Sequence, residues 1–158
     1  MDEQSKKTAL RMIPYGLYVL GTKDGDALGA ATINWVTQAS FQPPLLAMGI
    51  KADSKTLRHL KSDGKFAPSI LGAGQKDVAF AFFKPTEASG DSINGYRYET
   101  QETGAPLLVD APAWVEGRVA EIVKRGDHSV VIAQVIGAGV RQETAVLTLA
   151  ECGVNYGG

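Results

Sequence analysis

The feature that most constrains this chain is a series of short strand-like segments that follow one another without a regular alternation of strand and helix. These segments are rich in β-branched and aromatic residues and are bounded by Gly, Pro, Asn and Asp. They are expected at residues 16–20, 28–34, 35–41, 45–50, 66–71, 114–124, 129–140 and 144–149. A parallel sheet would need a crossover helix between successive strands, and this order supplies few. The sequence therefore predicts a mainly β fold, a β-barrel of mostly antiparallel strands with peripheral helices.

Short helices and one long connection complete the pattern. Helices are expected over residues 3–13, 53–60 and 75–83. Pro14 would end the first helix, and Asp53 would cap the second. Residues 84–106 hold Gly, Ser, Asn and Thr with little periodicity, which indicates a long loop of the kind that often forms a functional lid.

The two longest strand-like segments differ in their expected surroundings. Within residues 114–124, the polar Glu116 and Arg118 alternate with apolar residues, as in a strand with one exposed face. The run VVIAQVI at residues 130–136 is too apolar for a strand with one wet face. Its second face is expected to be covered by a partner subunit, so this run favours a homodimer.

Size and composition bound the class of protein. The 158 residues have room for one domain, expected to span residues 1–158, and an apolar share of 44% is that of an ordinary globular protein. A formal net charge of −1 argues against a nucleic-acid binder. The start of the chain lacks the apolar stretch of a signal peptide, and no run approaches the roughly 18 apolar residues of a membrane span. The single cysteine, Cys152, cannot form an internal disulfide, which suits a reducing compartment. A cytoplasmic protein that does not bind a membrane is therefore expected.

A polar pattern runs through residues 32–44, TINWVTQASFQPP. Four hydroxyl or amide side chains stand at even steps, Thr32, Asn34, Gln38 and Ser40. In an extended strand they would point to one face. Either this face meets water, or a flat heterocycle rich in amide groups supplies the hydrogen-bond partners that buried polar groups need. Periodicity alone leaves both interpretations open.

A second candidate site lies at the expected helix start after residue 50. Free backbone N–H groups and the positive end of the helix dipole make such a place receptive to phosphate. Ser54 and Thr56 add hydroxyl donors, and Lys51 or Lys55 adds positive charge. The alternative is an ordinary capped helix with two solvated lysines. A phosphate-binding site at this helix start, together with amide side chains on the preceding strand-like segments, is the arrangement that a mononucleotide needs.

A third candidate is His128, which follows a Gly126-Asp127 turn at the start of a strand. It is either a half-exposed structural residue or, with a site beside it, an acid–base group. Other signals are weaker. Asp77 stands where the third glycine of a Rossmann fingerprint would follow Gly72 and Gly74, so that dinucleotide site is not expected. The histidines and Cys152 are too scattered for zinc, so no metal site is expected.

At these residues the sequence resembles the flavin reductase-like family of FMN-binding split-barrel proteins. The landmarks are YGLYV at residues 15–19, ATINW at 31–35, QASFQPP at 38–44, SKT at 54–56, TGAPLL at 103–108 and GDH at 126–128. The resemblance extends from about Leu10 to the end of the chain. It is greatest to the flavin reductase modules fused to rubredoxin or found in flavodiiron proteins, where the opening tyrosines and a tyrosine near the end, here Tyr156, recur.

The resemblance implies a split barrel of about six strands with added elements, assembled as a homodimer with FMN bound non-covalently near the subunit interface. The cofactor-binding residues would be Thr32, Ile33, Asn34, Gln38, Ala39, Ser40, Lys51, Ser54, Lys55 and Thr56. His128 is the expected catalytic residue, beside the flavin or the nicotinamide. The chain lacks a loop lysine that many members carry, and Arg97 or Lys84 is the candidate to replace it.

The expected function is that of an FMN-dependent oxidoreductase, an NAD(P)H:flavin reductase-like enzyme that passes electrons through bound FMN. The first alternative is an FMN-binding electron-transfer module that serves a rubredoxin-like or flavodiiron partner and has no nicotinamide site of its own. The second is a ligand-storage or sensing barrel without turnover. The sequence does not specify the electron donor or acceptor.

Overall fold

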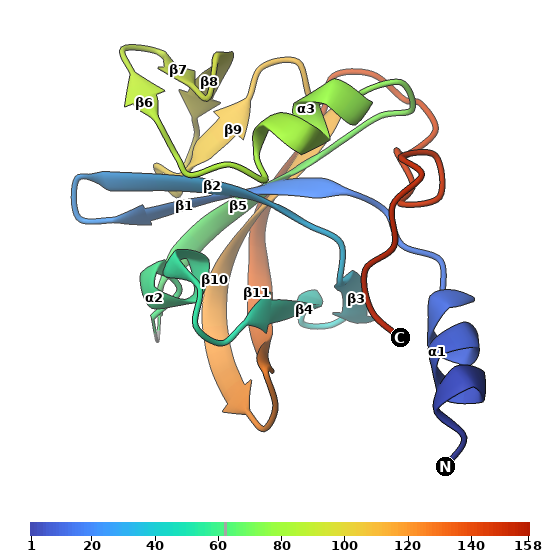
Figure 1. Ribbon diagram of the computed structural model, residues 1–158. Helices are drawn as coiled ribbons and strands as arrows, with labels where there is room; N and C mark the ends of the chain where they lie inside the picture. Colours follow the sequence, from blue (N-terminus) through green and yellow to red (C-terminus); the bar gives the residue numbers. More distant parts are fainter. Residues whose placement is uncertain (62) are drawn as a thin grey trace.

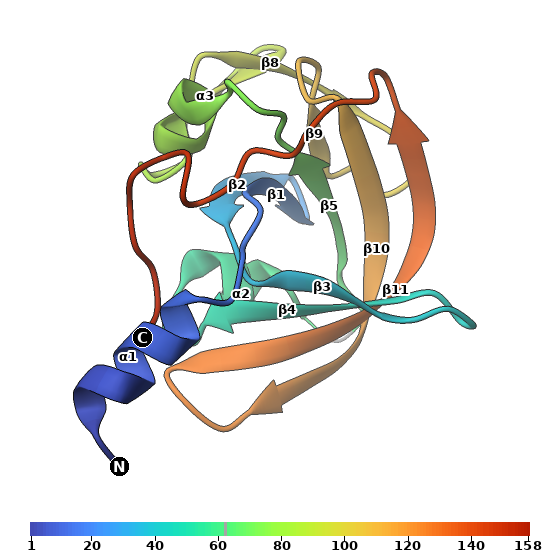
Figure 2. The same ribbon diagram turned by 90° about the vertical axis from the view of Figure 1, so that its right-hand side faces the viewer.

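The computed structural model describes residues 1–61 and 63–158 and is dominated by one curled sheet (Figure 1). Its seven strands are β1 (Tyr18–Asp24), β2 (Ala27–Ile33), β3 (Val36–Ser40), β4 (Leu45–Lys51), β5 (Lys65–Ile70), β10 (Ala113–Lys124) and β11 (His128–Val140). They are ordered β2-β1-β5-β10-β11-β4-β3, and every pairing is antiparallel. Figure 2 shows β10 and β11 running the height of the molecule and bending as they do so.

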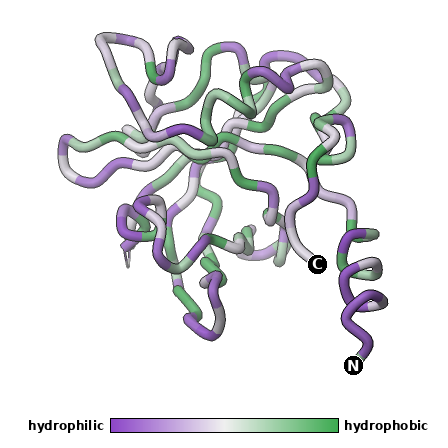
Figure 3. Tube along the Cα trace, viewed as in Figure 1, coloured by the Kyte–Doolittle hydropathy of each residue, from purple (hydrophilic) through white to green (hydrophobic). Residues whose placement is uncertain are grey.

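A smaller sheet and three helices lie around this one. The small sheet contains β6 (Ala88–Ser89), β7 (Ser92–Ile93), β8 (Tyr96–Thr100) and β9 (Pro106–Leu108). The helices are α1 (Glu3–Arg11), α2 (Lys55–His59) and α3 (Lys76–Ala81). Helix α1 has no buried residue, and Figure 3 shows it as largely hydrophilic. It therefore lies outside the core.

The mainly β, antiparallel fold predicted from the sequence is confirmed. The sheet has seven strands, and it curls without closing: in the described part of the chain, β2 pairs only with β1 and β3 only with β4. The barrel is thus open along these two strands.

Two apolar cores pack on opposite faces of β1. Val19 contacts a cluster that includes Leu71 and Phe82, beneath α3 and the small sheet. The next residue, Leu20, contacts a cluster that includes Phe66 and Val131, inside the curl of the main sheet. Because successive side chains of a strand point to opposite faces, β1 is buried on both sides.

The segment between Lys84 and Pro106 is not the irregular loop that its composition predicts. It forms β6, β7 and β8 and leads into β9. Its turns use Asn94 and Gly95, both with positive φ, and the Asn94 amide donates to the carbonyl of Ala81 at 2.9 Å. Strands as short as the two-residue β6 and β7 are too brief to show alternation, which explains why the sequence pattern missed them.

The strand expected at residues 144–149 is also absent as a continuous element. This segment makes isolated bridges, Val146 with Gly72 and Thr148 with Gly16. Its backbone alternates between two partners: Leu147 N–H donates to the carbonyl of Leu71, and the Leu147 carbonyl accepts from Leu17 N–H, both at 2.9 Å. A segment shared between two neighbours in this way satisfies its polar groups without forming a ladder.

Helix boundaries differ from the prediction at the second helix. Asp53 is not its cap; Ser54 is, because the Ser54 hydroxyl accepts from Leu57 N–H at 3.1 Å. The carboxylate of Asp53 instead lies 3.5 Å from the ammonium of Lys51 at the surface.

The expected exposure of Glu116 is wrong as well, since only 3% of this residue is accessible. A register shift follows Glu116 in β10 and changes the alternation there. Its carboxylate accepts hydrogen bonds from the hydroxyl and the N–H of Thr103, at 2.6 and 2.8 Å. These partners allow the charge to be buried.

Candidate functional site

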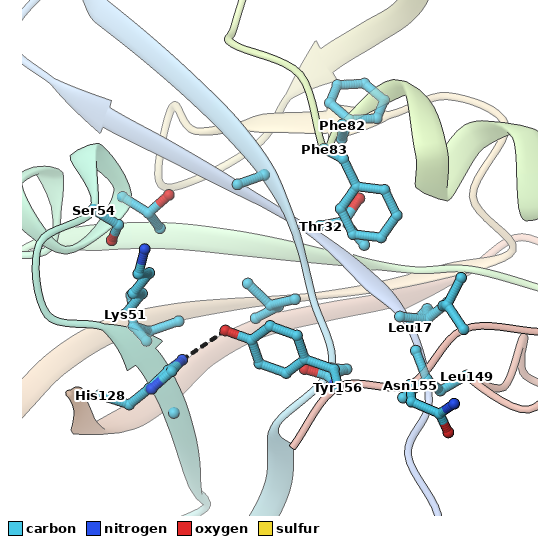
Figure 4. A pocket seen from close by; sticks show the side chains of 17 residues that line it. Leu17, Thr32, Lys51, Ser54, Phe82, Phe83, His128, Leu149, Asn155 and Tyr156 are labelled. Atoms are coloured by element: carbon cyan, nitrogen blue, oxygen red, sulfur yellow. Dashed lines mark hydrogen bonds between the residues drawn. The ribbon is translucent and has the colours of Figure 1, made fainter. Parts of the chain in front are cut away.

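A pocket of about 430 Å³ opens between β2, β4, the start of β11 and the C-terminal tail (Figure 4). It brings together residues that the sequence placed in separate motifs: Thr32, Ile33, Asn34, Lys51, Ser54, Thr56 and His128. Figure 4 shows Lys51 and Ser54 on one side, Phe82 and Phe83 on another, and the ring of Tyr156 between them, reaching His128. Polar groups of three motifs therefore converge on one cavity, as in ligand sites generally.

Strand β2 supplies the end of the pocket nearest α3. The Thr32 hydroxyl donates to the carbonyl of Ala79 at 2.6 Å, and Thr32 N–H donates to the carbonyl of Phe82 at 3.1 Å. These bonds fix the strand against α3. Asn34 is 8% exposed, and its Nδ2 is buried without a hydrogen-bond partner among the described residues. A buried amide of this kind is an unused donor at the pocket wall.

The segment from β4 into α2 supplies the opposite end. Lys51 ends β4, and Ser54 and the half-buried Thr56 follow at the start of α2. Lys55, expected beside them, does not line this pocket but a neighbouring cavity. Within this pocket Lys51 and the hydroxyls of Ser54 and Thr56 thus lie at one end.

The remaining predicted residues, Gln38, Ala39 and Ser40, are not brought to this pocket. The chain leaves the strand conformation between Ile33 and Val36, so the even-step rule does not carry from β2 into β3. On β3 the amide of Gln38 donates to the carbonyl of Ser40 at 3.3 Å. The prediction of one polar face over residues 32–40 is wrong for this reason.

His128 has a neighbour at each ring nitrogen. Its Nδ1 lies 3.0 Å from a carboxylate oxygen of Asp127, and its Nε2 lies 2.7 Å from the hydroxyl of Tyr156. The hydrogen bond to His128, with its charge, holds the pKa of the Asp127 carboxyl below its ordinary value. An imidazole held at both nitrogens has a defined orientation, as an acid–base group requires.

An aromatic cluster that the sequence did not predict surrounds this histidine. The ring of Trp35 lies 4.7 Å from that of His128 and 5.2 Å from that of Tyr156. Gly49 makes room for it, because a Cβ there would lie 2.8 Å from the indole. The tail that carries Tyr156 is tied to α1 by Arg11, whose Nε donates to the carbonyl of Gly157 at 3.2 Å. Trp35 in the landmark at residues 31–35 and the tyrosine near the end of the chain were the sequence signals for this cluster.

The flavin reductase like domain matches residues 10–156. The chain belongs to this family. The fold and family inferred from the sequence landmarks are thereby confirmed.

Among relatives of this flavin reductase-like chain, the flavin reductase (NADH) of Kitasatospora aureofaciens is 33% identical over 147 residues, covering 90% of this chain and 75% of that protein. Diflavin flavoprotein A 1 of Synechocystis sp. is 31% identical, over 89% of this chain and 24% of that protein. The high molecular weight rubredoxin of Moorella thermoacetica is 30% identical, over 90% and 63%. The styrene monooxygenase flavin reductase of Pseudomonas putida S12 superposes with a TM-score of 0.78 and 26% identity, over 96% and 94%.

The chain spans less than half the length of the first curated relatives that it matches, 24% of the diflavin flavoprotein and 42% of a probable flavin reductase of Rhizobium meliloti. Within the described residues, no helix is long and apolar enough to cross a membrane. Nor do three or more His, Cys, Asp or Glu side chains gather there in a way that could hold a metal ion.

Proposed function

We propose that this chain binds FMN non-covalently in the pocket of about 430 Å³ and uses it as an NAD(P)H-dependent flavin reductase-like oxidoreductase. The observation that carries the proposal is the buried, unpartnered Nδ2 of Asn34 at a pocket that also holds His128 and a basic, hydroxyl-lined end. Family membership supports the same assignment.

The residues present fit a flavin. An isoalloxazine carries carbonyl oxygens and ring nitrogens at its edge, and any one of these acceptors would satisfy the Asn34 amide. The pocket is otherwise lined by apolar side chains such as Leu17, Phe82 and Leu149, which suit the faces of a planar ring system.

The phosphate of FMN would lie at the other end, beside Lys51, Ser54 and Thr56. Lys51 supplies positive charge, and the hydroxyls of Ser54 and Thr56 can donate hydrogen bonds to a phosphate. The Ser54 oxygen accepts from Leu57 N–H, which leaves its own proton for a ligand. Lys55 stands next to them on the neighbouring cavity. This end supports FMN over riboflavin, which lacks the phosphate.

When bound, the flavin supplies the hydride and electron transfer. The chain's own contribution is to orient the ring, keep water from it and manage a proton. His128 lies at the pocket with its ring fixed by Asp127 and Tyr156, so a proton can be held or passed at its Nε2. The apolar side chains that line the pocket, among them Leu17 and Leu149, exclude solvent from the space that the flavin ring would occupy.

The second candidate is an FMN-binding electron-transfer module without a nicotinamide site, serving a rubredoxin-like or flavodiiron partner. Similarity to the diflavin flavoprotein and to the high molecular weight rubredoxin favours it, since this chain matches only part of each. Both candidates require bound flavin, and only the first requires oxidation of NADH or NADPH by the isolated chain.

We infer that residues 1–158 form one cytoplasmic domain that assembles as a homodimer. Val130 on β11 is 44% exposed in the single chain, so the apolar run there has a face for a second subunit to cover. In such a dimer, the edge strand β3 would contact flavin only at the pocket of the partner subunit, through Gln38, Ala39 and Ser40. Light scattering should give a mass near twice 16.7 kDa; a monomer with FMN bound contradicts the dimer.

The decisive experiment is an absorbance spectrum of the purified protein, followed by titration with FMN and by steady-state oxidation of NADH and NADPH. Flavin bands with nicotinamide oxidation support the reductase. Flavin bands without it, but with reduction by a carrier protein, support the electron-transfer module, and flavin bands with neither support a storage or sensing role. Failure to bind FMN at all would overturn the proposal.

A further inference from the structure

Residues 154–158, the C-terminal tail, lie between the proposed flavin pocket and solvent. Val154, Asn155 and Tyr156 line the pocket, and all three are exposed, Tyr156 to 44%. The tail belongs to no helix or strand, and Figure 2 shows it descending from the level of α3 to α1. These residues therefore face the pocket on one side and water on the other, as the residues of a lid do.

The tail is held by contacts on two sides. At the pocket, the Tyr156 hydroxyl lies 2.7 Å from Nε2 of His128, and the Tyr156 ring lies 5.2 Å from that of Trp35. At α1, the Nε of Arg11 donates to the carbonyl of Gly157 at 3.2 Å. Because Arg11 belongs to α1 and not to the pocket wall, its bond acts on the tail without touching a ligand in the pocket.

The packing between α1 and the tail is sparse. A cavity of about 100 Å³ lies between them, lined by Arg11, Ile13 and Val154 among others. Helix α1 has no buried residue, so it adds little apolar packing to the hydrogen bond from Arg11. A segment with few buried contacts opens at a low free energy. The closed position of the tail thus depends on a small number of contacts.

These contacts join protein groups to one another, and none of them requires a bound flavin. The tail should therefore open about as readily over a filled pocket as over an empty one. A ligand that passes such a gate waits for the same opening on entry and on exit. Loosening the gate then raises both rate constants by the same factor and leaves the Kd unchanged.

We propose that residues 154–158 form a gate over the flavin pocket and that the hydrogen bond from Arg11 to Gly157 keeps this gate closed. The inference rests on the proposed flavin site and deepens it, because the gate determines how the flavin is used. A closed gate retains FMN through many turnovers as a resident cofactor. A gate that opens readily lets free flavin exchange as a substrate.

The test compares Arg11→Gln with Lys7→Gln, which removes a charge from the same helix and leaves the Arg11 bond in place. Stopped-flow quenching of FMN fluorescence gives the association rate constant. Trapping of released FMN with an excess of an apoflavoprotein gives the dissociation rate constant. Loss of one exposed hydrogen bond should raise both rate constants about two- to fivefold and leave the Kd within about twofold. Lys7→Gln should match the parent.

A second variant, Gly157→Ala, loosens the tail by another route. Gly157 has a φ of +99°, which an L-residue adopts only with strain. A Cβ there would also lie 3.1 Å from Cζ2 of Trp35. The closed tail is therefore destabilised without a change at Arg11, and both rate constants should again rise together. Thermal unfolding checks that each variant is folded at the temperature of the measurement.

Equal increases in association and dissociation support the gate. Unchanged rate constants in both variants would show that the tail does not limit exchange, and the inference would be wrong. Faster dissociation with unchanged association would also overturn it, because the tail would then be a contact of the bound flavin and not a gate. A parent protein that binds no FMN would instead reject the proposed function on which the inference rests.

Discussion

The Nε2 of His128 lies 2.7 Å from the hydroxyl of Tyr156, although the two residues are 28 positions apart in the sequence. The contact joins the start of β11 to the C-terminal tail, over the pocket that both residues line. It makes the tail part of the site.

His128→Ala should retain flavin and fold but slow flavin reduction, and the pH dependence of the rate near neutrality should flatten. The reason is that the variant lacks the one imidazole at the pocket. Stopped-flow reduction across pH 6 to 8, with whichever donor is active, measures both effects. Equal rates and equal pH profiles would make His128 a structural residue.

Tyr156→Phe should keep the ring contact with Trp35 but remove the hydroxyl that holds His128. One lost hydrogen bond predicts a two- to tenfold slower reduction, about 0.5–1.5 kcal/mol. If the tyrosine acts through the histidine, the double variant with His128→Ala should be no slower than His128→Ala alone. Additive losses would show that Tyr156 acts independently.

Asn34→Leu should move stability and binding in opposite directions. Its Nδ2 is buried without a partner, so an apolar side chain of similar shape should leave the flavin-free protein equally stable or up to about 1 kcal/mol more stable. Flavin should bind about tenfold more weakly because its acceptor loses this donor. Thermal unfolding and flavin titration test the two effects, with Thr37→Val on β3 as the control.

Replacing both Ser54 and Thr56 by Ala should weaken FMN binding without abolishing it, because the backbone N–H groups remain. Riboflavin, which has no phosphate, should bind parent and variant alike. Since Ser54 caps α2, the variant should also lose about 0.5–2 kcal/mol of stability, so binding is compared where both proteins are folded. Unchanged FMN affinity would place the phosphate elsewhere.

The buried His59 predicts a pH-dependent stability. Burial, reinforced by Lys55, lowers the pKa of His59 below the ordinary 6.5. The unfolded chain therefore takes up this proton first as the pH falls, so the contribution of His59 is complete above about pH 6.5 and is lost below it. Urea midpoints should fall more between pH 7.5 and 5.5 in the parent than in His59→Gln. Equal pH slopes would show that His59 does not govern this change.

The sequence predicted much of the scaffold because the relevant signals are local. An Asp-Gly turn joins β1 and β2, and Gly25 adopts the positive φ that glycine allows there. The segment from Lys51 to Thr56 follows a strand into a helix, as expected, and lines the pocket with hydroxyls. Here chain order alone determines which groups lie together.

Other features depend on long-range packing. Gln38 and Ser40 share the even spacing of Thr32 and Asn34, yet a bend near Trp35 separates them from the pocket. Glu116 looks like a surface residue until Thr103 supplies its hydrogen bonds. The spacing of residues along the sequence does not show where the chain bends or which distant residue supplies a hydrogen bond.

The sequence by itself determined the antiparallel β architecture, the family and the candidate polar groups, because period, turn chemistry and short motifs are written along the chain. Only the tertiary structure decided that Asn34 is buried with an unused donor, that Tyr156 returns to His128, and that Arg11 ties the tail to α1. These three features involve residues that are far apart in the sequence. They lie together because the sheet curls and its two cores pack against it.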